Sequence, residues 1–298
     1  MNIAVIGTVY VDIKGFPTGD FVPAGRNVGL IRQFHGGVAR NIAEDVAGLG
    51  EDAFFIGLTD KSGIGADVIK HLKEKKVQTD YIRATDDGMG TWLAVFDKNG
   101  EVCANVSARP NLLPICDILE ESGEEIFSLA DSILLEIDID EKIVAETFRL
   151  AEKHSVPVYA VISNMTIAKE RIQYIRKTDC FVCNSQEAGI LFGQDVEGVK
   201  PERMLELLQV KKKELQIPTM VVTMDELGAV YAGENGEIGH LPAQKVKVID
   251  TTGAGDAFFA GTAVGLTGGK TLRDACALGI EAASVVICTE ENVYSSIE

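Results

Sequence analysis

The stretch Asp250–Gly261, which reads D-T-T-G-A-G-D-A-F-F-A-G, follows a strand-like run, Val246–Ile249, and leads into an apolar helix-like segment. The small residues Gly253–Gly255 let backbone N–H groups approach an anion, which the free donors and the dipole of a helix N-terminus favour. Asp256 then lies in the first helical turn. A carboxylate there repels a bare phosphate, but it suits a base that takes the proton of a hydroxyl attacking a phosphoryl group. An Asp that only caps a helix after a glycine turn is the simpler alternative.

Short apolar runs alternate with amphipathic segments along the rest of the chain. Strands are predicted at Ile3–Ile6, Ala53–Gly57, Ser132–Leu135, Val158–Ile162, Cys180–Cys183 and Met220–Thr223. Helices are predicted over Arg40–Leu49, Gly65–Lys75, Glu141–Lys153, Pro201–Leu215 and Thr271–Val286. This order predicts an α/β fold with a mainly parallel central sheet and helices on both faces. Sheets of this kind bind ligands beyond the carboxyl ends of their strands.

Two regions depart from the alternation. Lys14–His35 has no helical period, and Gly88–Ser107 contains two strand-like runs joined by a turn at Lys98-Asn99-Gly100, which is typical of a hairpin. We expect a small β-strand lid drawn from about residues 13–35 and 88–108, on one domain spanning residues 1–298. The exposed edges of a sheet lid favour pairing, which predicts a homodimer through the lid.

Charge and composition exclude several classes of protein. The 298 residues carry 28 Lys+Arg and 45 Asp+Glu, a net charge of −17, so nucleic acid is not expected as a partner. No apolar run reaches the roughly 18–20 residues that span a bilayer, and the N-terminus lacks the basic start of a signal peptide. Six cysteines are too few for a disulfide scaffold, which predicts a cytoplasmic location. The Cys180–Cys183 pair is expected to pack in a strand.

With its D-T-T-G-A-G-D-A-F signature, the chain resembles the PfkB (ribokinase-like) family of carbohydrate and nucleoside kinases. The likeness runs from about residue 2 to about residue 290. It implies that Asp256 is the catalytic base and that the backbone of Gly253, Ala254 and Gly255 forms the anion hole for the γ-phosphate of ATP. It also implies that Asp250 helps to form a monovalent-cation site, for example for K⁺.

Two further motifs are similar to the acceptor site of this family. Gly36–Ala43 reads G-G-V-A-R-N-I-A, and the resemblance implies that Gly37 and Asn41 contact sugar hydroxyls. Asp12, after the first strand, matches an Asp that binds sugar hydroxyls. Tyr10 stands where many sugar kinases have Asn. Arg40 belongs to a form of the motif similar to pseudouridine kinases, although it also fits a surface position on a helix.

Two motifs after the Cys180–Cys183 strand resemble the nucleotide side of the family site. Asn184 and Glu187 match its N-x-x-E motif, which implies contacts with Mg²⁺, its waters and the phosphates; a helix start with an acidic first turn is the alternative. Thr223 and Gly228 match the T-x-G-x-x-G nucleotide loop. Asp225 stands in that loop where glycine is usual, and it adds negative charge near the expected nucleotide.

The resemblance implies ATP- and Mg²⁺-dependent transfer of a phosphoryl group to a hydroxymethyl group of a sugar or nucleoside. Pseudouridine and a free sugar such as ribose or fructose remain alternatives for the acceptor. A catalytically weak member that binds a ligand or regulates another protein is the alternative function. The segment Gly265–Thr271 fails as a P-loop because Val264 stands where the motif requires glycine.

Overall fold

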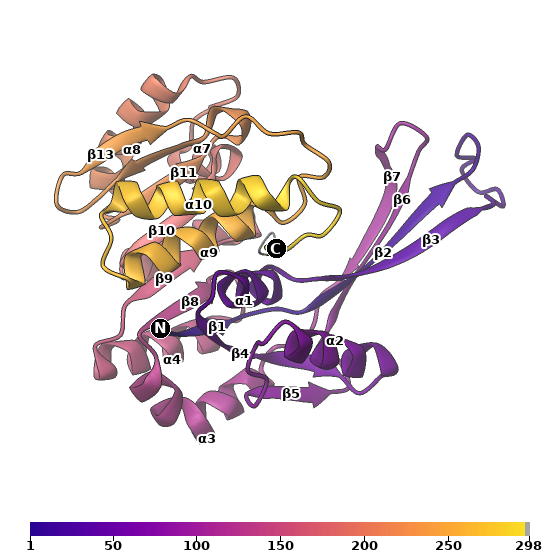
Figure 1. Ribbon diagram of the computed structural model, residues 1–298, viewed down its shortest axis with the longest axis horizontal. Helices are drawn as coiled ribbons and strands as arrows, with labels where there is room; N and C mark the ends of the chain where they lie inside the picture. Colours follow the sequence, from indigo (N-terminus) through magenta and orange to yellow (C-terminus); the bar gives the residue numbers. More distant parts are fainter. Residues whose placement is uncertain (296–298) are drawn as a thin grey trace.

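The computed structural model describes residues 1–295, which form two β-sheets and the helices packed on them (Figure 1). The strand order of the larger sheet is β13-β12-β11-β10-β9-β8-β1-β4-β5. Its strands are β1 (Asn2–Ile6), β4 (Asp52–Asp60), β5 (Ile82–Thr85), β8 (Ser132–Glu136), β9 (Val158–Val161), β10 (Cys180–Asn184), β11 (Met220–Thr223), β12 (Ala229–Ala232) and β13 (Ile238–Leu241).

The larger sheet is mainly parallel, as the sequence predicts. Strand β1 pairs in parallel with both β4 and β8, and the parallel pairing continues through β9 and β10 to β11. At one edge β12 and β13 form an antiparallel hairpin that the sequence analysis does not predict. The first strand is buried because it lies inside this sheet, between β8 and β4.

Helices cover both faces of the larger sheet (Figure 1). They are α1 (Val38–Gly48), α2 (Gly63–Glu74), α3 (Pro114–Leu129), α4 (Glu141–His154), α5 (Met165–Ala168), α6 (Ile172–Ile175), α7 (Ser185–Phe192), α8 (Pro201–Leu215), α9 (Ala254–Thr267) and α10 (Leu272–Val286). Successive side chains of a strand point to opposite faces. In β1, Ala4 and Ile6 therefore join the core formed with α3, α4, α7 and α8, whereas Ile3 and Val5 join the core formed with α1, α2, α9 and α10.

The smaller sheet projects from the body of the molecule and corresponds to the expected lid strands (Figure 1). Its order is β3-β2-β6-β7, with β2 (Tyr10–Pro17), β3 (Gly29–Gly36), β6 (Gly90–Phe96) and β7 (Val102–Ala108). Strands β6 and β7 form the predicted antiparallel hairpin, and β2 pairs in parallel with β6. Because β2 begins four residues after β1 ends, the small sheet is joined directly to an interior strand of the large one.

The prediction of a strand at Val246–Ile249 is wrong, because the segment between β13 and α9 pairs with no other strand of residues 1–295. Val248 and Ile249 are 55% and 54% exposed, and the amide of Ile249 donates to the carbonyl of Ile287 at 2.7 Å. β-Branched residues favour extended backbone, but a strand also requires a neighbouring strand to pair with. This segment instead runs over the surface toward the helix that it precedes.

Two smaller expectations are confirmed. The segment after α9 is a turn between two helices, in which Gly269 has φ 74° and α10 begins at Leu272. Cys180 and Cys183 are buried, unpaired core residues. Over residues 1–295, no helix combines the length and the apolar character that a membrane span requires.

Candidate active site

A cavity of about 590 Å³ lies between the carboxyl ends of the central strands and the base of the small sheet. Its lining combines carboxylates, hydroxyls and arginines with a few apolar side chains. The polar and charged residues in it are Thr8, Tyr10, Asp12, Ser107, Arg109, Asn111, Glu136, Asp138, Asp140, Ser163, Asn164 and Arg171. A cavity of this size at this edge of a parallel sheet has the usual position of a small-molecule site.

Asp12 and Gly37 line this cavity, as the sequence predicts for an acceptor site. Asp12 lies on β2 between Phe34 of β3 and Trp92 of β6. Burial raises the pKa of Asp12, although Lys14 and Arg40 oppose the shift. Gly37 caps α1 with φ 101°, and a Cβ there would lie 2.6 Å from the carbonyl oxygen of Thr8. The tight join between β3 and α1 therefore requires glycine at this position.

Glu136 and Asp138 also line the cavity, and neither is among the site residues expected from the sequence. Glu136 ends β8, and its Oε2 accepts hydrogen bonds from the Thr8 amide at 2.9 Å and the Thr8 hydroxyl at 2.8 Å. Burial raises the pKa of Glu136 to about 7, and the Asp138 carboxylate adds to the shift. The sequence contains a signal for Glu136, because a carboxylate at the carboxyl end of a buried parallel strand lies at the edge of the sheet where ligands bind.

Asp256 lies in the first turn of α9, and its Oδ2 accepts a hydrogen bond of 2.7 Å from the Asn41 side chain. Burial raises the pKa of Asp256 to about 6, against the lowering effects of that hydrogen bond and of Arg40. A base with a pKa near the working pH is suited to proton transfer. Asn41 is only 5% exposed and is not among the cavity-lining residues, so the structure places it on Asp256 instead of in the cavity.

The N-terminus of α9 has the form of an anion cradle. Gly253 caps the helix with φ 81°, and a Cβ there would lie 1.9 Å from the carbonyl oxygen of Asn292. No side chain caps this helix end, and a Cβ on Gly255 would meet nothing within 4 Å. Backbone donors at a helix N-terminus beside open space fit a phosphate group. Ala254, the first helical residue, completes the predicted loop.

The residues expected on the nucleotide side meet at the carboxyl ends of β10 and β11, where Asn184 pairs with Thr223. Asn184 and Glu187 form a capping box: the Asn184 side chain accepts from the Glu187 amide, and Glu187 Oε2 accepts from the Asn184 amide, both at 2.8 Å. The two residues therefore form the start of α7, as expected of a helix start with an acidic first turn. Burial raises the pKa of Glu187 to about 7, with Asp138 and Asp256 adding to the shift.

Asp225, the departure from the glycine-rich pattern, has φ 47°. Glycine adopts left-handed backbone without steric strain, and Asp is among the few other residues that adopt it. The loop thus keeps its backbone shape and changes only its charge. Gly228 has φ 90°, and a Cβ there would lie 2.0 Å from the carbonyl oxygen of Leu241, so packing against the end of β13 is enough to require this glycine.

Asp250 is exposed, and its Oδ1 accepts hydrogen bonds from the Thr252 amide at 2.9 Å and the Thr252 hydroxyl at 2.8 Å. Burial raises the pKa of Asp250, but these bonds outweigh it and the net pKa is lowered. Over residues 1–295, no group of three or more His, Cys, Asp and Glu side chains could hold a metal ion. A cation here would therefore depend on backbone oxygens, water or substrate phosphates for its other ligands.

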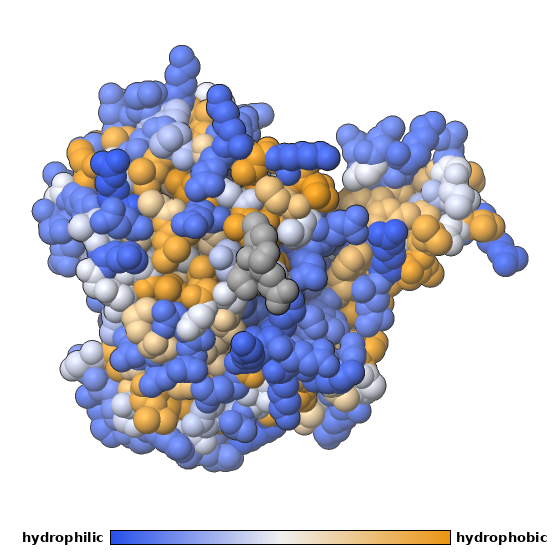
Figure 2. All heavy atoms as spheres, in the orientation of Figure 1, coloured by the Kyte–Doolittle hydropathy of each residue, from blue (hydrophilic) through white to orange (hydrophobic). Residues whose placement is uncertain are grey.

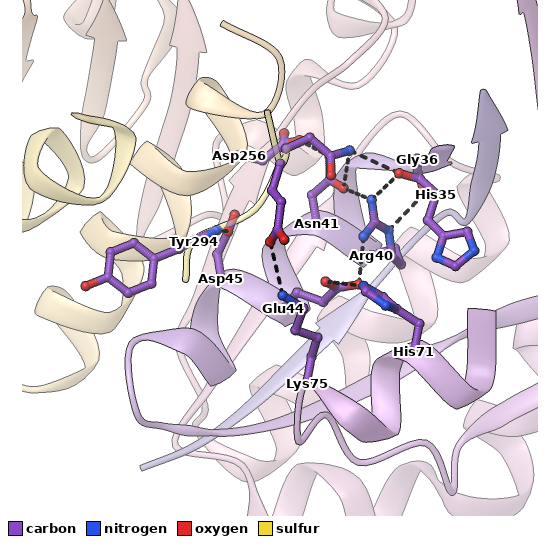
Figure 3. A network of polar contacts seen from close by, with 12 residues as sticks. His35, Gly36, Arg40, Asn41, Glu44, Asp45, His71, Lys75, Asp256 and Tyr294 are labelled. Carbon is purple, nitrogen blue, oxygen red and sulfur yellow. Dashed lines mark hydrogen bonds and ion pairs between the residues drawn. The ribbon is translucent and has the colours of Figure 1, made fainter. Parts of the chain in front are cut away.

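Arg40 does not lie on the surface, and that alternative is wrong. It is 1% exposed, and its guanidinium donates to carbonyl and carboxylate oxygens on every side (Figure 3). An amphipathic pattern could not reveal this burial, because the aliphatic stem and the charged head of an arginine suit different environments.

Residues 1–298 match the pfkB family carbohydrate kinase. The chain is 34% identical over 297 residues to a guanosine-inosine kinase of Exiguobacterium acetylicum, covering 98% of this chain and 96% of that one. It is 26% identical over 293 residues to a ribokinase of Bacillus subtilis strain 168, covering 97% and 93%. An Arabidopsis thaliana ribokinase, solved with ribose and ATP, shares the fold with a TM-score of 0.83 at 19% identity, over 98% and 95% of the two chains.

Proposed function

The chain belongs to the pfkB family of carbohydrate kinases, phosphotransferases with an alcohol group as acceptor, and from that membership we propose that it transfers the γ-phosphoryl group of ATP to a hydroxymethyl group of a purine nucleoside. One observation carries the proposal. Asp256, a half-buried carboxylate with one oxygen held by Asn41, lies at the uncapped N-terminus of α9. A protein that only binds a ligand has no use for a base beside an anion cradle.

In this proposal Asp256 takes the proton of the acceptor hydroxyl as that oxygen attacks the phosphoryl group. The backbone amides of Gly253, Ala254 and Gly255 donate to the oxygens of the transferring group, where negative charge has to be stabilised. Asp12 accepts hydrogen bonds from hydroxyls of the acceptor, and the backbone of Gly37 limits how deeply the acceptor enters. The small sheet excludes water that would otherwise compete as the acceptor.

The remaining residues are assigned to the nucleotide and the cations. Thr223 and the loop around Gly228 would contact ATP, and Asn184 and Glu187 would hold Mg²⁺ through its waters. Bound Mg²⁺ supplies positive charge that neutralises the phosphates. Glu187 keeps one oxygen on the Asn184 amide in the capping box, so only its other oxygen is available for a magnesium-bound water. Asp250 would contribute to a monovalent-cation site for K⁺, with backbone carbonyls as the other ligands.

The proposed acceptor is a 6-oxopurine nucleoside, guanosine or inosine, because the relative of that name is 34% identical over nearly the whole chain. The cavity of about 590 Å³ is within the usual range for small-molecule sites and extends beyond Asp12 to arginines and carboxylates. These charged groups offer donors and acceptors that the polar edge of a base can use and that a free pentose does not need. Pseudouridine, ribose and fructose are the competing acceptors.

The test is acceptor-dependent release of ADP in the presence of Mg²⁺ and ATP, with guanosine, inosine, adenosine, pseudouridine, ribose and fructose compared. We expect guanosine and inosine to have the highest kcat/KM, and Asp256→Asn to lose at least ~10²-fold in kcat, since it removes the general base. Preference for a free sugar or pseudouridine would overturn the acceptor class. Folded protein that turns over none of the six would favour a ligand-binding or regulatory protein.

The lid also suggests how the protein assembles, and we propose a homodimer formed lid to lid. Strands β3 and β7 are the two edges of the small sheet. Ile31 and Val106 on them are 79% and 68% exposed, and Figure 2 shows apolar side chains gathered over the projecting part of the molecule. Open sheet edges with apolar side chains favour pairing with another chain. Light scattering should give twice the chain mass of 32.0 kDa, and Ile31→Lys with Val106→Lys should reduce it to one chain.

A further inference from the structure

Arg40 is a fully buried charge whose hydrogen-bond partners all lie between His35 and Glu44 (Figure 3). Its Nε donates to the carbonyl of Gly36 at 3.1 Å, and its Nη2 donates to the carbonyl of His35 at 2.6 Å. The same Nη2 donates to Oδ1 of Asn41. A buried guanidinium is costly unless its donors have partners, and the structure gives Arg40 a carboxylate, two carbonyls and an amide oxygen as acceptors.

The side chain of Asn41 can be placed in two orientations, and its neighbours select one of them. Donors surround Oδ1, namely Nη2 of Arg40 and Nδ2 of Asn292, the latter at 3.4 Å. The amide nitrogen must therefore point the other way, where it donates to Oδ2 of Asp256. If the amide were reversed, its oxygen would face the Asp256 carboxylate and its N–H₂ would face the guanidinium.

We propose that Arg40 is a positioning residue for phosphoryl transfer, which holds the amide of Asn41 in the orientation that fixes Asp256. This inference rests on the proposed function, in which Asp256 is the base. Asn41 restrains one oxygen of Asp256, and no hydrogen bond from residues 1–295 to its other oxygen, Oδ1, is present. That second oxygen is left to meet the acceptor hydroxyl in a fixed place. A rigidly held base matters because small displacements of reacting groups cost large factors in rate.

Glu44 and His71 hold Arg40 in turn. Oε1 of Glu44 accepts from Nη1 of Arg40 at 2.6 Å, and Oε2 of Glu44 lies 3.1 Å from Nε2 of His71 on α2. Glu44 is itself fully buried, and its pKa is lowered: burial raises it, but the hydrogen bond with His71 and the charge of Arg40 outweigh burial. The chain of contacts therefore runs from α2 through α1 to Asp256 on α9.

The charges around Asp256 make Arg40 the positive group that balances several carboxylates. Asp45 on α1, Glu136 on β8 and Glu187 on α7 all interact electrostatically with Asp256, and each of these carboxyls has a raised pKa to which Asp256 contributes. Arg40 and the Asn41 amide oppose this negative surrounding. Removing Arg40 should therefore raise the pKa of Asp256 as well as free its side chain.

The experiment combines a titration with kinetics. Carboxyl ¹³C NMR follows Asp256, assigned by its loss in Asp256→Asn, and needs no turnover. In Arg40→Met combined with Glu44→Gln, a neutral pair, we expect the Asp256 midpoint to rise by about one pH unit. We expect kcat to fall by ~10–100-fold while the KM for ATP stays within about twofold.

Arg40→Lys separates position from charge and is the variant to use if the double substitution does not fold. An ammonium keeps the charge but cannot reproduce the planar fork that reaches Glu44, His35 and Asn41 together. We therefore expect kcat to fall here also, and the Asp256 midpoint to rise, because a released Asn41 amide no longer lowers that pKa. An unchanged kcat and midpoint in Arg40→Lys would overturn positioning. Arg149→Met, which removes an exposed arginine paired with Glu146, should leave both quantities unchanged.

A double-mutant cycle supplies the final control. In an Asp256→Asn background the Arg40 substitutions should cost less than about twofold further, because the group that they position is gone. A full additional loss would show general damage and overturn the proposal. If the parent protein turns over no acceptor, the proposed function fails by itself, and the NMR midpoints still decide whether Arg40 positions Asp256.

Discussion

Gly255→Ala should separate stability from activity, because the structure leaves open space where the new methyl group would go. Gly255 lies in the first turn of α9 and has no left-handed φ, and a Cβ there would meet nothing within 4 Å. Alanine is favoured over glycine in a helix by about 0.5–1 kcal/mol. Since 1 kcal/mol shifts the Tm of a domain of this size by about 2–4 °C, we expect Tm to rise by about 2 °C.

The same methyl group should damage catalysis, because the open space beside α9 is where the proposed phosphoryl group lies. Removing or blocking one donor to a developing negative charge typically costs ~10²-fold in rate. We therefore expect kcat for Gly255→Ala to fall by at least ~10-fold while Tm is maintained. Thermal unfolding and acceptor-dependent ADP release on the same preparation make the comparison.

Gly253→Ala is the matched control in the same loop. Its Cβ would lie 1.9 Å from the carbonyl oxygen of Asn292 and its φ is 81°, so it should lose at least about 1–2 kcal/mol and several degrees of Tm together with activity. If Gly255→Ala kept full activity, the space beside the helix would not be the phosphate site. If it lowered Tm as Gly253→Ala does, the described packing of the loop would be wrong.

Three further perturbations test the charges of the site. The pKa of Asp256, about 6, predicts that kcat/KM falls ~10-fold from pH 7 to pH 5. A base with the ordinary Asp pKa of 3.8 would leave kcat/KM almost constant over this range, so a pH profile that is flat to pH 5 would refute the assignment of Asp256 as the base. Glu136→Gln should stabilise the protein at pH 8 by up to about 3 kcal/mol in denaturant unfolding. The folded pKa of about 7 exceeds the ordinary 4.5, so the wild type loses stability as pH rises between these values, and the advantage of the variant should vanish near pH 4.5. Asp225→Gly should change the free energy of unfolding by less than about 0.5 kcal/mol, because the relief of backbone strain at φ 47° offsets the greater freedom of glycine in the unfolded chain. It should lower the KM for ATP a few-fold by removing a negative charge, and an unchanged KM would place the nucleotide elsewhere.

Much of the fold could be predicted because local pattern and tertiary structure agree. Buried parallel strands are continuous apolar runs, so β1, β8, β10 and β11 were visible in the sequence. Val246–Ile249 misled for the opposite reason. Its β-branched residues favour extended backbone, but pairing depends on what the rest of the chain places beside it.

The resemblance points to Gly37 and Gly253, and the structure places both where backbone geometry restricts the residue type. Sequence patterns say less about a side chain whose partner is distant in the sequence. Nothing local to Asn41 indicates that its amide meets Asp256, 215 residues away, and nothing in the helical pattern of α1 indicates that Arg40 is enclosed. Those contacts depend on how α1 packs against α9, which a single sequence does not display.

The cavity-lining residues all fall between Thr8 and Arg171, whereas the proposed phosphate and nucleotide residues fall between Asn184 and Asp256. The two parts meet at the hydrogen bond between Asn41 and Asp256, and neither of these residues lines the cavity. Substitutions confined to the cavity lining can therefore alter the preferred acceptor without removing that contact. An ancestral kinase of this architecture could acquire new substrates after gene duplication by drift in its cavity lining alone. A hybrid joined between Arg171 and Asn184 should inherit acceptor preference from its N-terminal parent, as long as both parents have the Asn41–Asp256 pair.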